Sequence, residues 1–302
     1  MITWLRHRLS KERELRMIWE VERDAKRSYL VGTAHFFPYH FRGSLHRYIS
    51  RAETVLFEGP LDEDSARAIV EYGSSGAGAV CLLDALDPMT ISKISRELGG
   101  PPPGSGSHQM LRSLLGPDPD VPDWGRIKGM RPWMAFFQIW SHYLGKNGWT
   151  CNMELDALRI AGDLAKPVYY LETIEEQLEA LDNVPFERFV WFLSHADWGR
   201  SRRELLACYL RGDLEGQMAR IGGYPTVCEA IVGRRDPVLF ERMQPFLERG
   251  SSIAFVGASH CPGIRKMLAG AGYKVDTPAR LARRSRPSTG RTPRIGGFIP
   301  SA

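Results

Sequence analysis

The chain has 302 residues, of which 43% are hydrophobic and 25% are charged, and its formal net charge is +5. These proportions are ordinary for a soluble globular protein, and the length allows one sizeable α/β domain or two small ones. The five scattered cysteines form no C-x-x-C pair, which argues against a disulfide framework and a thiolate zinc site. No apolar run approaches the roughly 20 residues that span a bilayer. Residues 1–21 are too charged for a signal peptide, so we expect a cytoplasmic protein without membrane contact.

Two stretches differ from the rest of the chain in composition. Residues 99–125 are rich in Pro and Gly and are expected to form a long loop or insertion. Residues 279–294 are rich in arginine and contain no acidic residue. We therefore predict a single folded domain over residues 1–278, followed by a basic, disordered tail over 279–302. Because arginine attracts any phosphate, the tail is no specific sign of nucleic-acid binding, which we do not expect.

The first elements in chain order are two strands joined by a polar turn, a short amphipathic helix and a third strand: residues 17–21, 28–32, 46–53 and 54–60. Strand, helix and strand at this spacing predict a right-handed crossover with parallel strands. The carboxyl ends of parallel strands share one edge of a sheet, where open α/β sheets hold their ligands. His35 and Glu58 follow two of these strands, so we expect them to be neighbours in space.

Helices and strands alternate over the remaining chain. The expected helices are 62–72, 131–144, 153–165, a helix that begins after Thr173, most of 186–221, 236–250 and 263–275. The expected strands are 166–173 and 251–260, with a short strand after the last helix. Within 153–165 the apolar positions predict a buried side made of Leu155, Leu158, Ile160, Ala161 and Leu164. This alternation predicts a three-layer α/β fold, with a mainly parallel central sheet flanked by helices.

The motif G-x-x-H occurs twice, each time behind an apolar strand: Gly32 to His35 and Gly257 to His260. A single histidine in this position is more often structural than functional. Two such histidines with the strand-end carboxylate of Glu58 form a frequent ligand set for a hydrolytic divalent metal. Such a metal lowers the pKa of bound water towards 7. A glycine before each histidine permits a tight turn or a close approach of the backbone.

Six stretches, taken in order, resemble the TraB/PrgY/GumN family, which includes the Tiki metalloproteases. They are "YLVGTAHFFP", "RAETVLFEGP", "RPWM", "LAKPVYYLETIEEQLEAL", "GRRDPVLFERM" and "FVGASHCPGIRKMLAGAGYKV". The resemblance covers about residues 17–275 and extends more distantly to erythromycin esterases and ChaN-like proteins. It implies that His35, Glu58 and His260 occupy metal and catalytic positions. It also places Arg235 where a guanidinium could bind a substrate carboxylate or stabilise an oxyanion.

The chain departs from the family pattern at three positions. Asp236 stands where asparagine is usual, Glu154 stands where many members have aspartate, and Ala165 replaces the glycine before Lys166. None of these changes removes a proposed ligand. Asp236 could, however, pair with the neighbouring Arg235 and alter its role.

Three functions remain open on this basis. The first is a hydrolase of a peptide or amide bond that uses Mn²⁺, Co²⁺ or Zn²⁺ held by His35, Glu58 and His260, with Glu154 or Glu172 as proton shuttle and Arg235 orienting the substrate. The second is a non-catalytic module that binds a peptide or small ligand. The third is a metal-free esterase with His35 as general base, oriented by Glu58.

Other aromatic and histidine residues are predicted to have packing or surface roles. His40 and His46, which follow the first motif, are expected at the surface, although one of them could contact substrate. The segments "PWMAFFQIW" and "FVWFL" are expected to form core, or the face of a homodimer.

Overall fold

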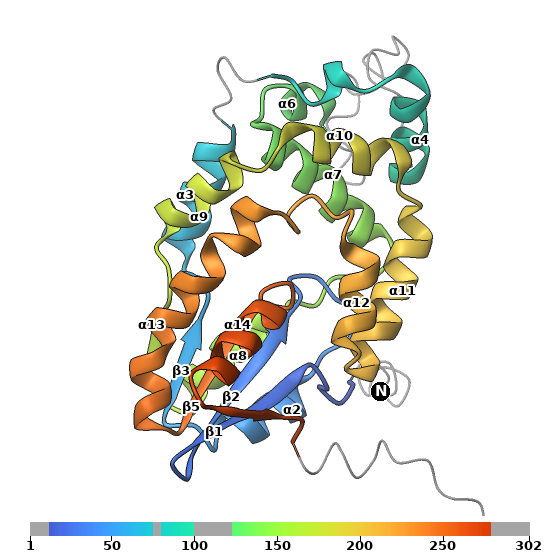
Figure 1. The fold of residues 1–302 in the computed structure, drawn as a ribbon. Helices are drawn as coiled ribbons and strands as arrows, with labels where there is room; N and C mark the ends of the chain where they lie inside the picture. Colours follow the sequence, from blue (N-terminus) through green and yellow to red (C-terminus); the bar gives the residue numbers. More distant parts are fainter. Residues whose placement is uncertain (1–11, 75–79, 100–122, 279–302) are drawn as a thin grey trace, which may run out of the picture.

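The computed structural model describes residues 12–74, 80–99 and 123–278 (Figure 1). Most of the predicted insertion at 99–125 and the whole predicted tail at 279–302 lie outside the described residues. None of the helices in the part that is described has the length and apolar character needed to span a bilayer.

The described residues build one mixed sheet of six strands: β1 (Ile18–Arg23), β2 (Lys26–Thr33), β3 (Thr54–Phe57), β4 (Val168–Tyr170), β5 (Ser252–Gly257) and β6 (Lys274–Asp276). Their order is β4-β3-β5-β2-β1-β6. The four strands from β4 to β2 pair in parallel, whereas β1 pairs antiparallel with both β2 and β6. The predicted α/β class is confirmed, with an antiparallel edge added to the parallel part.

Strand β5 lies between β2 and β3, although it comes from the far end of the chain. Thr33 of β2 is in register with Gly257, and Phe57 of β3 is in register with Phe255. The crossover from β2 to β3 is therefore parallel as predicted, but it leaves a gap that β5 fills. Residues 253–256 of β5 are almost completely buried, as expected for a strand with neighbours on both sides and helices on its faces.

Helices flank the sheet and form a separate group at one end of it (Figure 1). In chain order they are α2 (Arg42–Ile49), α3 (Glu63–Ser74), α4 (Pro88–Leu98), α6 (Trp124–Lys128), α7 (Pro132–Lys146), α8 (Met153–Asp163), α9 (Ile174–Asp182), α10 (Phe186–His195), α11 (Trp198–Arg211), α12 (Leu214–Ile221), α13 (Arg235–Arg249) and α14 (Cys261–Gly270). A 3₁₀ turn (Leu83–Ala85) and a π-helical turn (Glu229–Gly233) complete the described elements. Thr173 caps α9, as its sequence predicts, and forms a reciprocal capping box with Glu176.

The aromatic segments of α7 and α10 form core, as predicted. Phe136 of α7 is fully buried and contacts Phe189 and Phe192 of α10. Trp140 meets Trp198 at the start of α11 edge to face. A homodimer through these segments stays a prediction.

The buried side predicted for α8 is right in part. Ala161 is buried, and Leu158, Ile160 and Leu164 pack partly buried against the core. Leu155, however, is 46% exposed, whereas Glu154 and Asp156 beside it are buried. The helix is rotated so that both carboxylates face inward, because each of them binds a histidine from the segment after β2. Apolar periodicity assumes that the inward face is apolar, and in the first turn of α8 polar contacts override it.

Candidate functional site

The sheet brings the three predicted ligand residues to one edge. His35 follows the end of β2 by two residues, Glu58 follows β3 directly, and His260 follows β5 by three residues as the N-cap of α14. Because these strands are parallel and adjacent in the order β3-β5-β2, their carboxyl ends lie together.

The glycine of each motif is required by the close packing of the two motifs. A Cβ on Gly32 would lie 3.0 Å from Sγ of Cys261 and 3.3 Å from Cα of Ala258. A Cβ on Gly257 would lie 3.3 Å from Oε2 of Glu58 and 3.4 Å from the ring of His260. The absence of a side chain therefore lets the first motif pack against the second and lets Glu58 approach the second motif.

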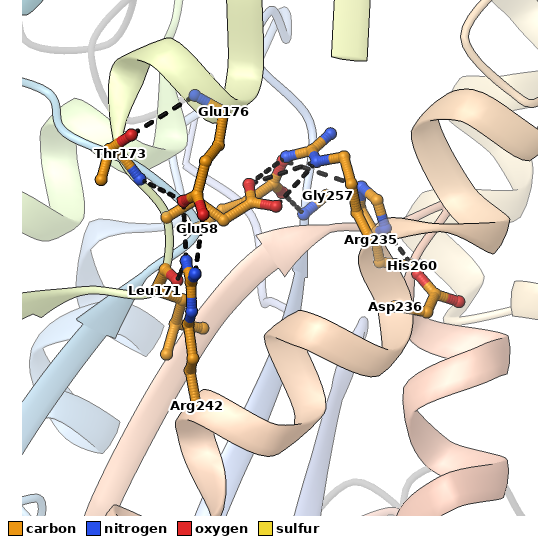
Figure 2. A network of polar contacts seen from close by, with 10 residues as sticks. Glu58, Leu171, Thr173, Glu176, Arg235, Asp236, Arg242, Gly257 and His260 are labelled. Carbon is orange, nitrogen blue, oxygen red and sulfur yellow. Dashed lines mark hydrogen bonds and ion pairs between the residues drawn. The ribbon is translucent and has the colours of Figure 1, made fainter. Parts of the chain in front are cut away.

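Glu58 is the centre of a buried ion network, shown in Figure 2. Its Oε1 accepts a hydrogen bond of 2.5 Å from Nη2 of Arg235, and its Oε2 accepts one of 2.7 Å from the backbone N–H of Gly257. Arg235 also donates to Glu172 through Nε (2.9 Å) and Nη2 (2.5 Å). The sequence places Glu172 and Arg235 far apart, and the structure joins them with Glu58 in one network.

The charges of this network determine the protonation of Glu58. Burial by itself would raise the pKa of its carboxyl group, but the positive charges of His260 and Arg235 and the Gly257 N–H outweigh burial and lower the pKa to about 2. Burial by itself would lower the pKa of the Arg235 guanidinium, but the carboxylates of Glu172 and Glu58 outweigh burial and raise it. Glu58 and Arg235 therefore remain a charged pair at neutral pH.

His260 is buried between two carboxylates. Its Nδ1 lies 2.6 Å from Oδ1 of Asp236, and its Nε2 lies 3.7 Å from Oε1 of Glu58 (Figure 2). Asp236 follows Arg235 in the sequence, yet Asp236 binds His260 whereas Arg235 binds Glu58 and Glu172. The expectation that Asp236 pairs with Arg235 is thus wrong, because the two side chains leave the start of α13 towards different partners. Burial is also the main cause that raises the pKa of Asp236.

His35 is held by a carboxylate from a different helix. Its Nδ1 lies 2.5 Å from Oε2 of Glu154 on α8, and the hydroxyl of Thr33 donates to Oε1 of the same carboxylate (2.8 Å). The Glu154 carboxylate is the main cause that raises the pKa of His35 to about 9. In contrast to Glu154, the side chain of His35 is 70% exposed.

The donor types at this edge suit a divalent metal better than their positions do. Each histidine has its Nδ1 on a buried carboxylate, which leaves Nε2 for another partner, as is usual for metal-binding histidines. Within the described ranges, however, no group of three or more His, Cys, Asp or Glu side chains is placed to hold a metal. Glu58 and His260 approach each other, His35 does not complete a ligand group with them, and Arg235 occupies one Glu58 oxygen.

The sequence gives no indication that Thr33 belongs to the site or that Asp236 binds a histidine. Thr33 is the last residue of β2 and looks like any buried β-branched strand residue. Asp236 lies in the first turn of a helix, where acidic residues are common for electrostatic reasons. Neither position carries a local signal of its partner, because both partners are distant in the chain.

Comparison with known proteins supports the resemblance seen in the sequence. Residues 17–277 match the model of the TraB/PrgY/gumN family. This range contains all six described strands and both G-x-x-H motifs. No curated protein matches the chain at a significant level. A distant relation to erythromycin esterases and ChaN-like proteins stays a prediction. With a match over most of its length, the chain belongs to the TraB/PrgY/gumN family.

Proposed function

We propose that the protein is a hydrolase of a peptide or amide bond, with His35, Glu58 and His260 as its reactive groups. The observation that carries this proposal is the pair of histidines at one sheet edge, each bound at Nδ1 by a buried carboxylate. This contact fixes the ring and directs Nε2 away from the carboxylate, as in catalytic and metal-binding histidines. Desolvating this many charges is costly, so such a network is weak support for a purely stabilising role.

The other polar residues of the site suit positioning roles. Glu154 is occupied by His35 and Thr33, which favours orientation of His35 over transfer of a proton to substrate. Glu172 binds Arg235 through both carboxylate oxygens, so we assign it to holding the guanidinium. Arg235 would then stabilise a developing oxyanion or bind a substrate carboxylate, while it keeps Glu172 as counter-ion.

Metal dependence is the form of this proposal that we favour. A bound Mn²⁺, Co²⁺ or Zn²⁺ would supply an acidic bound water and polarise the substrate carbonyl. His35, Glu58 and His260 would hold it, with Glu154 and Asp236 fixing the two rings from behind. For this, Glu58 has to give up part of its contact with Arg235, and His35 has to join Glu58 and His260.

A metal-free esterase is the second candidate, and the His35–Glu154 contact favours it. The exposed ring of His35 can reach a substrate from solvent, and a carboxylate at Nδ1 is how a general-base histidine is oriented. A pKa of about 9, however, leaves most of the imidazole protonated at neutral pH, which suits an acid better than a base. In this form Glu154, rather than the predicted Glu58, is the residue that orients His35.

Metal titration combined with hydrolysis assays separates these candidates. Protein stripped with chelator is titrated with Mn²⁺, Co²⁺ and Zn²⁺ by calorimetry, and each form is assayed against peptide, amide and ester substrates. We expect about one equivalent of metal to bind wild type, and both binding and turnover to be lost in His35→Gln and His260→Gln. His46→Gln, on the neighbouring helix α2, is the matched control.

Each other result points to a different function. Ester turnover without metal binding, lost in His35→Gln, would replace the metal hydrolase with the metal-free esterase. Saturable ligand binding without turnover in any metal form would support a binding protein for peptides or small molecules. If the protein shows no turnover and binds no metal or ligand, the proposal is wrong.

A further inference from the structure

A second set of reactive side chains lies beside the first G-x-x-H motif and takes no part in the network around Glu58. Sγ of Cys151 lies 3.3 Å from Nε2 of His40. Nδ1 of the same ring lies 2.6 Å from Oδ2 of Asp156. Thiol, imidazole and carboxylate thus follow one another in the order nucleophile, base and orienting group.

The fold builds this set by running two segments side by side. Phe37 and Cys151 exchange two backbone hydrogen bonds, of 2.8 and 2.9 Å. Asp156, in the first turn of α8, then reaches His40, and Nε of Arg42 donates to its other oxygen (2.9 Å). The orientation of the His40 ring is therefore fixed from both sides, by Cys151 and by Asp156.

We propose that Cys151 is a reactive thiol whose proton His40 accepts, and that small electrophiles such as hydrogen peroxide modify it. Once the proton has moved to His40, the imidazolium and the guanidinium of Arg42, which binds the same Asp156, stabilise the thiolate. The thiol also precedes the N-cap of α8 by one residue, where the helix presents its positive end. Cys151 is only 4% exposed, whereas the side chains of His40 and Arg42 are partly exposed, so we expect reagents to approach the thiol from their side.

The reaction with peroxide balances with the groups present. The thiolate attacks one peroxide oxygen, so that an S–O bond forms and the O–O bond breaks. The leaving hydroxide takes the proton of the His40 imidazolium and departs as water. Sulfur is oxidised by two electrons to a sulfenic acid, the peroxide is reduced, and His40 is left neutral.

Rates of cysteine modification in the full-length protein test this proposal. The protein is treated with iodoacetamide at neutral pH, and the labelled cysteines are followed over time by peptide mass spectrometry. Cys208 is an internal control, since it is also buried and lies 3.5 Å from Nη2 of Arg211, with no imidazole contact among the described residues. We expect Cys151 to react at least about tenfold faster than Cys208. Dimedone should label Cys151 selectively after treatment with hydrogen peroxide.

Variants of the imidazole and the carboxylate identify the cause of the reactivity. His40→Gln should lower the Cys151 rate by about tenfold, and Asp156→Asn should lower it less, because the ring is retained. His46→Gln should leave the rate unchanged. A loosened fold would raise the Cys208 rate as well, so the ratio of the two rates is the quantity compared. A wild-type ratio near one would overturn the proposal whatever the variants do, and so would an unchanged ratio in a folded His40→Gln protein.

Discussion

The two G-x-x-H motifs end strands that are neighbours in the sheet, yet their histidines have opposite surroundings. His260 is buried with Asp236 on one ring nitrogen and Glu58 near the other, whereas the side chain of His35 is 70% exposed and held at Nδ1 by Glu154. The motif determines where the backbone delivers each ring. Helices from elsewhere in the chain, α13 for His260 and α8 for His35, determine its partner and its exposure.

Removal of Arg235 should have the largest effect on stability, because it takes the cation out of the buried ion network around Glu58. In Arg235→Met, Glu58 and Glu172 would remain buried without their cation. We expect a loss of about 3–5 kcal/mol in the free energy of unfolding, measured by urea denaturation. The control Arg242→Met removes an exposed ion pair with Glu176 and a hydrogen bond to the Leu171 carbonyl, and it should cost only about 1–2 kcal/mol. Equal losses in the two variants would mean that water screens the Glu58 network.

The two histidine-binding carboxylates offer a more direct comparison. Asp236→Ala would leave Nδ1 of His260 without a partner in a buried position, at a cost of about 1–3 kcal/mol in unfolding free energy. Glu154→Ala frees His35, whose ring can bind water instead, but it also leaves the buried Thr33 hydroxyl without its acceptor, so we expect a loss no larger than that of Asp236→Ala. A larger loss for Glu154→Ala in urea denaturation would show that exposure of the ring does not decide the cost.

The sequence predicts the parts of this site that depend on local pattern. Apolar runs ended by polar residues place His35, Glu58 and His260 after strands, and parallel strands place them at one edge. The insertion of β5 between β2 and β3 could not be predicted locally, because β5 is about 200 residues away from both in the chain.

The partners of His35 and His260 could not be predicted either, because they too depend on contacts between distant parts of the chain. In the first turn of α8, Glu154 and Asp156 face inward, whereas the apolar pattern of the helix predicts Leu155 on the buried side. Asp236 and Arg235 are adjacent in the chain but bind separate groups, a distinction that depends on side-chain direction in the folded protein. Patterns of hydrophobicity carry information about burial, and carry little about which buried polar groups meet.

The glycines of the two motifs should tolerate alanine to different degrees. In Gly32→Ala, the new Cβ would meet the backbone Cα of Ala258 and the buried Sγ of Cys261, neither of which can move freely. We expect a loss of about 1–3 kcal/mol in urea denaturation. In Gly257→Ala, the Cβ would meet the side chains of Glu58 and His260, which can shift by a few tenths of an ångström. This variant should unfold nearer to wild type but lose metal binding or turnover, and the reverse order would contradict the packing described here.

The smallest effect is a dependence of stability on pH. The Glu58 network should lose stability at acid pH, and the His35–Glu154 contact should lose it at alkaline pH. The folded-state pKa of Glu58 is lowered from 4.5 to about 2, so its contribution is present above pH 4.5 and is lost as the pH falls towards 2. The folded-state pKa of His35 is raised from 6.5 to about 9, so its contribution is present below pH 6.5 and is lost as the pH rises through 9. Because the His35 side chain is largely exposed, solvent screens its pair with Glu154, and we expect only a small loss of stability at alkaline pH.

Glu154→Gln removes the charge that raises the pKa of His35. The unfolding free energy of this variant should therefore change less than that of wild type between pH 6.5 and 9, whereas the loss at acid pH due to Glu58 should remain. Urea denaturation of both proteins across this range measures the difference, and parallel curves on the alkaline side would show that the His35–Glu154 contact contributes no pH-dependent stability.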